Sequence, residues 1–202
     1  MPDSPGWHAR GYLPHFDDGR AMQAITYHLA DSLPVHVCRR LEEQALDDAQ
    51  RRAAVEHYLD AHHGTCLLRQ PSCAAAVRDA LHHRNDHDYR LYAWVIMPNH
   101  VHVIVEPLAE VTIGKTVSAW KSVSARRILE ATDAEATGGG RGPGGPQIRR
   151  GRIWQLDYFD RYIRNQRHYR AAVDYIHRNP VTAGLVARAE DWPWSRAYQG
   201  PV

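Results

Sequence analysis

The spacing of apolar residues changes partway through residues 91–107. Leu91–Met97 is a nearly continuous apolar run, whereas apolar and polar residues alternate more from His100 onwards. Short apolar runs and period-two alternation are both typical of β-strands. Pro98 and Asn99 stand between the two patterns, and this pair is a turn signal. We therefore predict two adjacent strands joined by a tight, polar turn.

Side chains of a strand point alternately to its two faces. One face of the second strand then carries Val101, Val103 and Val105, and the other carries His100, His102 and Ile104. Two imidazoles on one face can converge on a single divalent cation, which requires neutral rings in a fixed orientation. From the spacing alone, a merely polar strand face explains the pattern equally well, because two ligands do not complete a metal site.

The remaining periodicities give a chain order of strand, helix, strand, strand, helix, strand. The single elements are a strand within 20–30, a long helix at Val37–His63, a helix at Ser72–His83, the strand pair above, a helix at Thr112–Thr132, a strand at Ile153–Ile163, and a last helix at Gln166–Arg178 that Asn179-Pro180 ends. This order is the βαββαβ pattern of an α+β, ferredoxin-like antiparallel sheet with helices on one face. The last helix is additional, and we expect it to cover the sheet face that carries His100 and His102.

The rest of the chain fits one domain of residues 1–202 with three accessory segments. Residues 1–18 look like an irregular N-terminal arm, and residues 180–202 form a Trp-rich C-terminal tail. Residues 133–151 include a glycine-rich run typical of a flexible insertion. Its glycines do not form a phosphate-binding loop, because no Gly-Lys-Ser/Thr follows.

Charge is distributed unevenly along the sequence. Between Lys115 and Arg178 there are 13 Lys and Arg against six Asp and Glu, a net charge of +7, while the remainder carries −5. This asymmetry favours a phosphate-bearing partner, although an ordinary solvated face would also explain it. The sequence has no apolar run approaching a membrane span and no secretory leader, so we expect a soluble, cytoplasmic protein without membrane contact.

A second group of residues lies on the last predicted helix. Tyr175 and Asn179 are four residues apart and therefore share one face. The Asn179 amide oxygen could complete a site with His100 and His102, and such a set suits Mg²⁺ or Mn²⁺ as well as a transition metal. A phenol has an ordinary pKa near 10, so Tyr175 would need a cation and a base to act as a nucleophile. By spacing alone, a core aromatic is the simpler interpretation.

Two segments together resemble the single-tyrosine HUH transposases. They are Met97–Val103, which contains the His-x-His pair, and Tyr175–Val181. The most similar subgroup is the REP-associated tyrosine transposases, which act on repetitive extragenic palindromes. Other segments that match this subgroup are Ala183–Val186, Trp154-Gln155, Asp160-Arg161, Ile163-Arg164, Arg10–Asp17 and Asp191–Ser195. The match covers most of the chain, is weakest over Glu42–Asp88 and is absent across the glycine-rich insertion.

The resemblance implies a specific chemistry. His100 and His102 would be metal ligands, Asn179 the third ligand in place of the glutamine usual in the wider family, and Tyr175 the nucleophile. Tyr175 would attack single-stranded DNA at a palindromic hairpin, with Mg²⁺ or Mn²⁺ as cofactor, to give a 5′-phosphotyrosine bond and a free 3′-hydroxyl. Reversal with another 3′-hydroxyl would transfer the strand. The subgroup implies a monomer, with a homodimer as the alternative.

Basic and aromatic residues of the second half are candidates for DNA contacts. Aromatic residues considered for base stacking are Trp120, Trp154 and Tyr158, although core packing is the commoner role of each. Two other functions remain open: a palindrome-binding protein without cleavage, and a metal-dependent hydrolase that uses water instead of Tyr175. Side chains expected to contact the DNA backbone are Lys121, Arg126, Arg127, Arg149, Arg150, Arg152, Arg161 and Arg164.

Overall fold

A four-stranded antiparallel sheet forms the centre of the molecule. The structure, a computed structural model, describes residues 7–10, 13–16, 20–34, 36–37, 39–40, 44, 47–108, 111–138 and 152–200. The strand order across the sheet is β4-β5-β3-β6. Its strands are β3 (Gln23–His28), β4 (Tyr89–Ile96), β5 (His100–Pro107) and β6 (Phe159–Tyr162).

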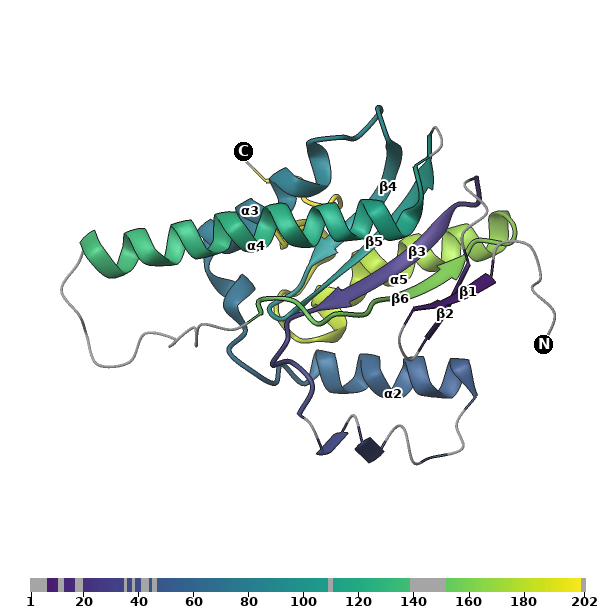
Figure 1. Cartoon of the computed structure of the whole chain (residues 1–202), viewed down its shortest axis with the longest axis horizontal. Helices are drawn as coiled ribbons and strands as arrows, with labels where there is room; N and C mark the ends of the chain where they lie inside the picture. The colour runs from purple at the N-terminus through teal and green to yellow at the C-terminus, as the bar shows by residue number, and fades with distance from the viewer. Residues whose placement is uncertain are drawn as a thin grey trace.

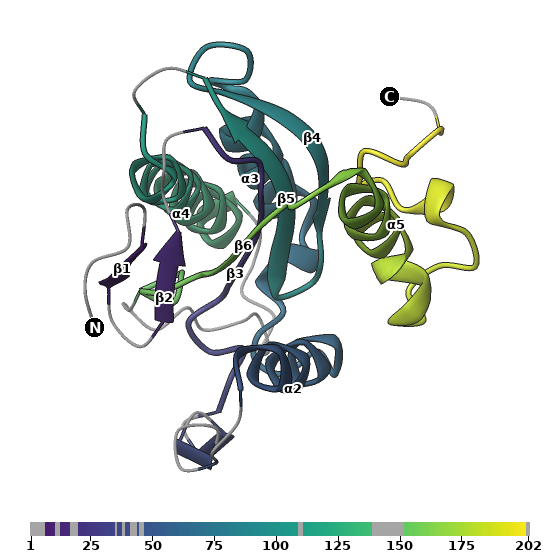
Figure 2. The ribbon, with the colours of Figure 1, turned by 90° about the vertical axis from the view of Figure 1, so that its right-hand side faces the viewer.

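Helices cover both faces of this sheet (Figures 1 and 2). Helices α3 (Pro71–His82) and α4 (Ile113–Gly138) lie on one face, and α5 (Gln166–Thr182) lies on the other. Helix α2 (Asp48–Asp60) lies at the end of the sheet where β3 ends and β5 begins. The predicted ferredoxin-like βαββαβ arrangement with an additional C-terminal helix is confirmed.

Alternation along β5 divides the core as expected. Val101, Val103 and Val105 are fully buried in the main core with α3 and α4. Ile104 points the other way and packs with Ile176 of α5 in a second, smaller core. Because side chains of neighbouring strands in register share a face, the α5 side of the sheet also receives Thr26 and His28 of β3, which are paired with His102 and His100.

The predicted helix at Val37–His63 is not continuous. Val37, Arg39 and Arg40 are helical, but Gln44 lies in a bend and Asp47 lies outside a helix, and α2 begins only at Asp48 and ends at Asp60. The Asp47 carboxylate accepts the Gln50 N–H at 2.8 Å, and Gln50 Oε1 accepts the Asp47 N–H at 3.0 Å. This reciprocal pair is a capping box, which stabilises a helix start and outweighs the apolar stripe that suggested continuity.

Several other element bounds differ from the prediction. Helix α3 begins at Pro71 after Gln70, so Ser72 is not its N-cap, because proline is well suited to the first helical position. Strand β6 is shorter than Ile153–Ile163, and Trp154 forms only an isolated bridge with Leu29. Residues 133–138, expected in the flexible insertion, continue α4, and residues 139–151 lie outside the described part of the chain.

Helix α5 also continues past its predicted end, through Pro180 to Thr182. Proline has no N–H to donate to the preceding turn, but helical hydrogen bonds continue after it. The carbonyls of Asn179 and Pro180 accept the N–H groups of Ala183 and Leu185 at 2.9 Å each. The additional turn keeps Asn179 inside the helix.

The two ends of the chain add short extended segments. Strands β1 (Trp7–Arg10) and β2 (Leu13–Phe16) pair with each other, so the expectation of an irregular arm was wrong for these residues. Near the other end, backbone bonds join Ile96 with Trp194 and Trp94 with Arg196, so the tail covers the outer edge of β4. Among the residues described, no helix combines the length and the apolar character needed to cross a bilayer.

Candidate active site

The first residue of the site, His100, is fully buried at the start of β5. Its Nδ1 lies 2.8 Å from Asn99 Oδ1, while Asn99 Nδ2 donates to the His63 carbonyl at 3.0 Å. An amide oxygen can only accept, so Nδ1 carries the proton and Nε2 presents a lone pair. Burial, followed by the neighbouring imidazoles, keeps the pKa of His100 well below its ordinary value. His100 is therefore neutral and in the tautomer that a metal ligand needs.

His102, two residues along β5, is also buried and also has a polar partner at Nδ1. Its Nδ1 lies 2.7 Å from the Thr26 hydroxyl on β3, its register partner. Burial lowers the pKa of His102 to about 3. The two rings stand 4.7 Å apart between centroids and nearly perpendicular. Strand alternation thus brings the rings together, and side chains of the turn and of β3 fix their orientation.

Tyr175 and Asn179 reach the same place from α5. The Tyr175 ring lies 5.4 Å from the His102 ring, at 81° between the planes. Asn179 is 2% exposed and Tyr175 is 40% exposed, so the amide is enclosed while the phenol faces an opening. Ile176 packs on Ala93, Val95, Met97 and Ile104, and this contact fixes the rotation of α5 that turns both residues toward the imidazoles.

Two carboxylates from α2 complete the surroundings, and neither was expected from the sequence. Asp60 Oδ1 lies 3.8 Å from His100 Nε2, and burial raises the pKa of Asp60 to about 6. Glu56 stands one helical turn earlier and lines the cavity beside Tyr175. Burial, then the negative charges of Glu56 and Asp60 and a hydrogen bond to Glu56, raise the pKa of Tyr175, while Asn179 lowers it.

Four buried polar atoms in this group have no hydrogen-bond partner: Nε2 of His100, Nε2 of His102, Oδ1 of Asn179 and Oδ1 of Asp60. Unpaired buried polar atoms are costly and call for an explanation. Two imidazole nitrogens and two oxygens are donors that a divalent cation accepts. Within the described ranges, no three His, Cys, Asp or Glu side chains are grouped to hold a metal ion. The fit therefore depends on the Asn179 amide oxygen beside the two imidazoles.

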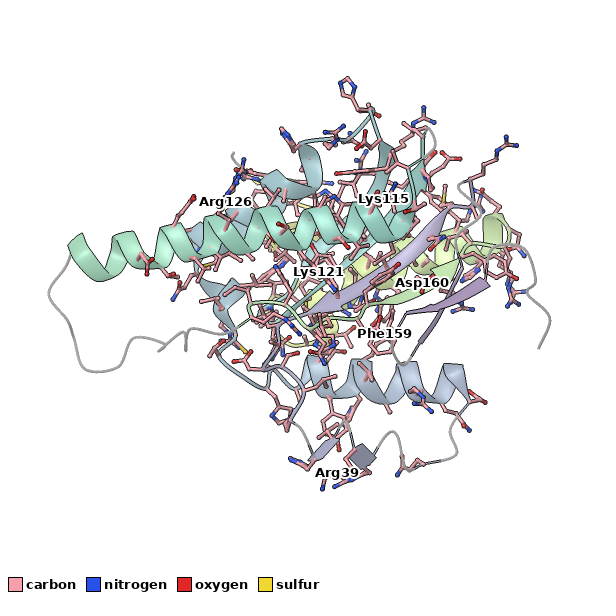
Figure 3. All side chains as sticks on the ribbon, in the orientation of Figure 1. Arg39, Lys115, Lys121, Arg126, Phe159 and Asp160 are labelled. Atoms are coloured by element: carbon pink, nitrogen blue, oxygen red, sulfur yellow. The ribbon has the colours of Figure 1, made fainter. Side chains whose placement is uncertain are left out.

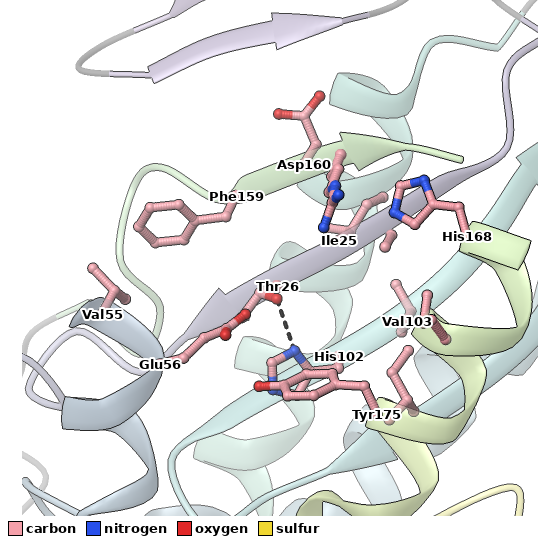
Figure 4. A pocket seen from close by; sticks show the side chains of 15 residues that line it. Ile25, Thr26, Val55, Glu56, His102, Val103, Phe159, Asp160, His168 and Tyr175 are labelled. Atoms are coloured by element: carbon pink, nitrogen blue, oxygen red, sulfur yellow. Dashed lines mark hydrogen bonds between the residues drawn. The ribbon is translucent and has the colours of Figure 1, made fainter. Parts of the chain in front are cut away.

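A cavity of about 290 Å³ opens next to these residues (Figure 4). It lies between β3, β6, α2 and α5, and Tyr175, His102 and Glu56 stand at one end, with His168 further along α5. Its wall is otherwise mainly apolar, from residues that include Ala24, Val55, Val103, Phe159, Ala171, Ala172 and Ile176. The tyrosine hydroxyl is thus reachable from outside, whereas the imidazoles are enclosed.

The basic residues predicted to contact DNA lie in different regions. Arg161 on β6 lines the cavity, and Arg164 follows β6 with its guanidinium over the Tyr162 ring at 5.2 Å. Lys121 and Arg126 lie on α4, on the other face of the sheet (Figure 3). Arg127 is also on α4, Arg152 is exposed, and Arg149 and Arg150 lie outside the described residues. Among the described residues of this set, Arg161 is the one that lines the cavity with Tyr175, and DNA contacts of the whole set remain predictions.

Lys121, one of the residues predicted to contact DNA, also has a structural role. Its Nζ donates to the carbonyls of Gln155, Leu156 and Asp157 at 2.8–3.1 Å. It also lies over the rings of Tyr27 and Tyr158, at 5.9 and 5.5 Å from their centroids. Lys121 therefore holds the segment before β6 against α4.

The aromatic residues considered for base stacking are core residues. Trp120 and Trp154 are 2% and 3% exposed, and both pack around Tyr27. Tyr158 is 9% exposed and belongs to the same core. Their rings have no free face on which a base could stack, so core packing is the role the structure supports.

The prediction missed Thr26, Asn99, Glu56 and Asp60. Asn99 directly precedes His100, so its position beside the ring could have been anticipated. Glu56 and Asp60 are four residues apart and share a helix face, which is a weak signal on a charged helix. Thr26 carries no signal of its own, because only the register of β3 against β5 places it beside His102.

Sequence comparisons show which family this chain belongs to. A family model described as "Transposase IS200 like" matches residues 70–179, which is more than half of the chain. A REP-associated tyrosine transposase of Escherichia coli (strain K12) is 29% identical over 117 residues, covering 57% of this chain and 59% of that protein. The chain thus matches less than two-thirds of this relative's length. A solved structure of a REP-associated tyrosine transposase bound to a REP hairpin aligns over 93% of this chain and 80% of that chain, at 20% identity and a TM-score of 0.48.

Proposed function

Since this chain belongs to the IS200-like transposase family, we propose that it cleaves and rejoins single-stranded DNA at palindromic, REP-like hairpins through a covalent bond to Tyr175. The resemblance found in the two sequence motifs is confirmed by the family match and by the E. coli relative. The single observation that carries the proposed chemistry is the position of the Tyr175 ring 5.4 Å from the His102 ring, which lies 4.7 Å from the His100 ring. Asn179 is buried one helical turn after Tyr175.

The proposed ligands of a divalent cation, Mg²⁺ or Mn²⁺, are His100 Nε2, His102 Nε2 and Asn179 Oδ1. Support comes from the burial of these atoms and from their missing hydrogen-bond partners. Asn99 holds the proton of His100 on Nδ1, and the Thr26 hydroxyl occupies Nδ1 of His102, so both Nε2 atoms are left for a ligand. When bound there, such an ion would supply Lewis-acid stabilisation of charge on the phosphate and would orient it. Asp60 adds negative charge beside His100, which favours a cation over an anion at this place.

In the proposed reaction the Tyr175 oxygen forms a bond to phosphorus and the bond from phosphorus to the 3′-oxygen breaks. The Glu56 carboxylate is placed to accept the phenol proton, because it lines the cavity beside Tyr175 and hydrogen-bonds to it. The departing 3′-oxygen takes a proton from solvent water. Reversal by another 3′-hydroxyl restores the phenol and joins the strands, so no nucleotide cofactor is needed.

The proposal is tested with labelled single strands that contain a hairpin, incubated with Mg²⁺ or Mn²⁺. The wild-type protein should form a covalent DNA adduct, and Tyr175→Phe should lose it completely while still binding the strand. Tyr169→Phe is the matched control, because Tyr169 is on the same helix but packs against Tyr92 outside the cavity. Binding without any adduct would instead support a palindrome-binding protein, and cleavage that persists in Tyr175→Phe would support a hydrolase using water.

A further inference from the structure

The cavity beside Tyr175 extends well beyond the tyrosine. His168, Ala171, Ala172 and Tyr175 follow one face of α5 at helical spacing and all line it. Seven residues separate His168 from Tyr175, so the far end lies about 10 Å along the helix axis from the nucleophile. The cavity therefore offers space for a part of a ligand next to the group that contacts Tyr175.

Phe159 and Arg161 form the wall opposite α5. They are two residues apart on β6 and pair with Thr26 and Ala24 of β3, so both side chains belong to the α5 face of the sheet. Phe159 packs on one side against apolar residues of α2 and lines the cavity as well. Arg161 brings a positive charge to the same rim. An aromatic ring with an arginine beside it is typical of surfaces on which bases of single-stranded nucleic acid stack.

His168 offers a fixed polar group at the far end. Its Nδ1 accepts the backbone N–H of Arg164 at 3.2 Å, and the backbone N–H of His168 donates to Oδ1 of the N-cap Asn165 at 2.9 Å. Because Nδ1 is an acceptor, the ring proton is on Nε2, which is left to donate. Burial, then the charges of Arg161 and Arg164, lower the pKa of His168 and keep the ring neutral. A cavity with apolar walls and few placed polar groups is the usual form of a small-ligand site.

We propose that this cavity receives one unstacked base of the DNA strand next to the phosphate that Tyr175 attacks, with Phe159 as its stacking surface and His168 Nε2–H as a donor to an acceptor atom on the base edge. The inference rests on the proposed function, because it assumes a DNA strand at Tyr175. The cavity volume of about 290 Å³ has room for a heteroaromatic ring, and the apolar alanines of α5 let the ring lie flat between α5 and β6. This site would give the protein a preference at one nucleotide position outside the hairpin.

The test is a double-mutant cycle between protein and DNA, measured as binding to hairpin strands in which each nucleotide near the cleavage position is made abasic in turn. It uses the Tyr175→Phe protein, so that strands stay intact. One abasic position should weaken binding by about 5- to 150-fold, the range expected for loss of one base–aromatic stack. In Tyr175→Phe/Phe159→Leu the same abasic change should have no further effect, because the stacking surface is already gone.

Phe159→Leu keeps an apolar side chain against α2, so the fold should be preserved. Tyr169→Leu is the matched control, since it removes an aromatic ring that lies outside the cavity, and it should leave the abasic effect intact. Equal abasic effects with and without Phe159 at every position would overturn the inference while leaving the proposed function standing. Failure to bind any of the intact hairpin strands would overturn both.

Discussion

The two faces of the sheet are made by the same strands but differ in how their polar atoms are satisfied. On the α3 and α4 side, Trp120 Nε1 donates to the Tyr89 hydroxyl at 2.7 Å, and that hydroxyl donates to the Leu81 carbonyl at 2.7 Å. Trp154 Nε1 donates to Ser124 Oγ at 3.0 Å, and the Tyr27 hydroxyl is an exception without a partner. The α5 side contains unpaired atoms of His100, His102, Asn179 and Asp60; the two imidazole rings lie 4.7 Å apart, and Asp60 Oδ1 lies 3.8 Å from His100 Nε2.

Within one domain, one face of the sheet therefore contributes mainly to stability and the other mainly to ligand binding. Satisfied polar groups in an apolar layer hold the fold together, whereas unsatisfied groups are retained at a cost and indicate a ligand. Because β5 alternates, each substitution on it affects one layer and leaves the other nearly unchanged. Substitutions on the α3 and α4 side should therefore lower the free energy of unfolding, whereas substitutions on the α5 side should lower the affinity for a metal ion.

The largest effect should come from Trp120→Ala on the α3 and α4 side. The variant leaves a large void and removes the hydrogen bond to Tyr89, so the free energy of unfolding should fall by about 3–5 kcal/mol. Denaturant titration measures this change. Leu129→Ala, an exposed position on the same helix, should change stability by less than about 0.5 kcal/mol. If the free energy of Mn²⁺ binding to folded Trp120→Ala fell by as much as the free energy of unfolding, the two faces would not act independently.

A smaller effect, confined to the other face, is expected from Thr26→Val. Valine keeps the shape of threonine but removes the hydroxyl that lies 2.7 Å from His102 Nδ1. Losing such a partner of a metal-binding imidazole lowers metal affinity by about 10- to 100-fold. Isothermal titration with Mn²⁺ measures this, and stability without metal should be nearly unchanged. An unaltered Mn²⁺ affinity would mean that Thr26 does not orient a metal ligand.

The smallest effect is a pH dependence of stability in the metal-free protein. Burial lowers the pKa of His102 to about 3, against an ordinary value near 6.5, so below pH 6.5 the unfolded chain binds a proton that the folded chain does not. Stability should therefore fall as the pH drops, by about 1.4 kcal/mol from this group at pH 5.5. The raised pKa of Asp60, about 6, acts in the opposite direction.

His102→Gln isolates the histidine contribution to that pH dependence. Unfolding free energies of wild type and variant in EDTA, compared at pH 7.5 and 5.5, should show a smaller loss in the variant. Parallel losses in both proteins would show that His102 is not held neutral by burial. The same variant should bind Mn²⁺ more weakly, which links the two properties of the ring.

Much of the architecture follows from local patterns. The turn at Pro98-Asn99, the alternation of β5 and the face shared by Tyr175 and Asn179 depend on residues close in sequence, and each was predicted correctly. The start of α2 also depends on local residues, the capping box of Asp47 and Gln50, but the prediction followed the longer apolar stripe and placed the start of the helix at Val37. Pro180 suggested a helix end four residues too early, because the carbonyls of Asn179 and Pro180 still accept N–H groups of the following residues.

The sequence by itself determined the fold class and the four residues expected to act together, since strand and helix periodicities set which side chains share a face. Only the tertiary structure decided which further groups surround them. Glu56 and Asp60 lie on α2, outside the residues of the family match. Thr26 reaches His102 through strand register, and the cavity toward Phe159 and His168 exists because α5 and β6 stand apart there. Such contacts join segments distant in the chain, and no local pattern encodes the packing that brings them together.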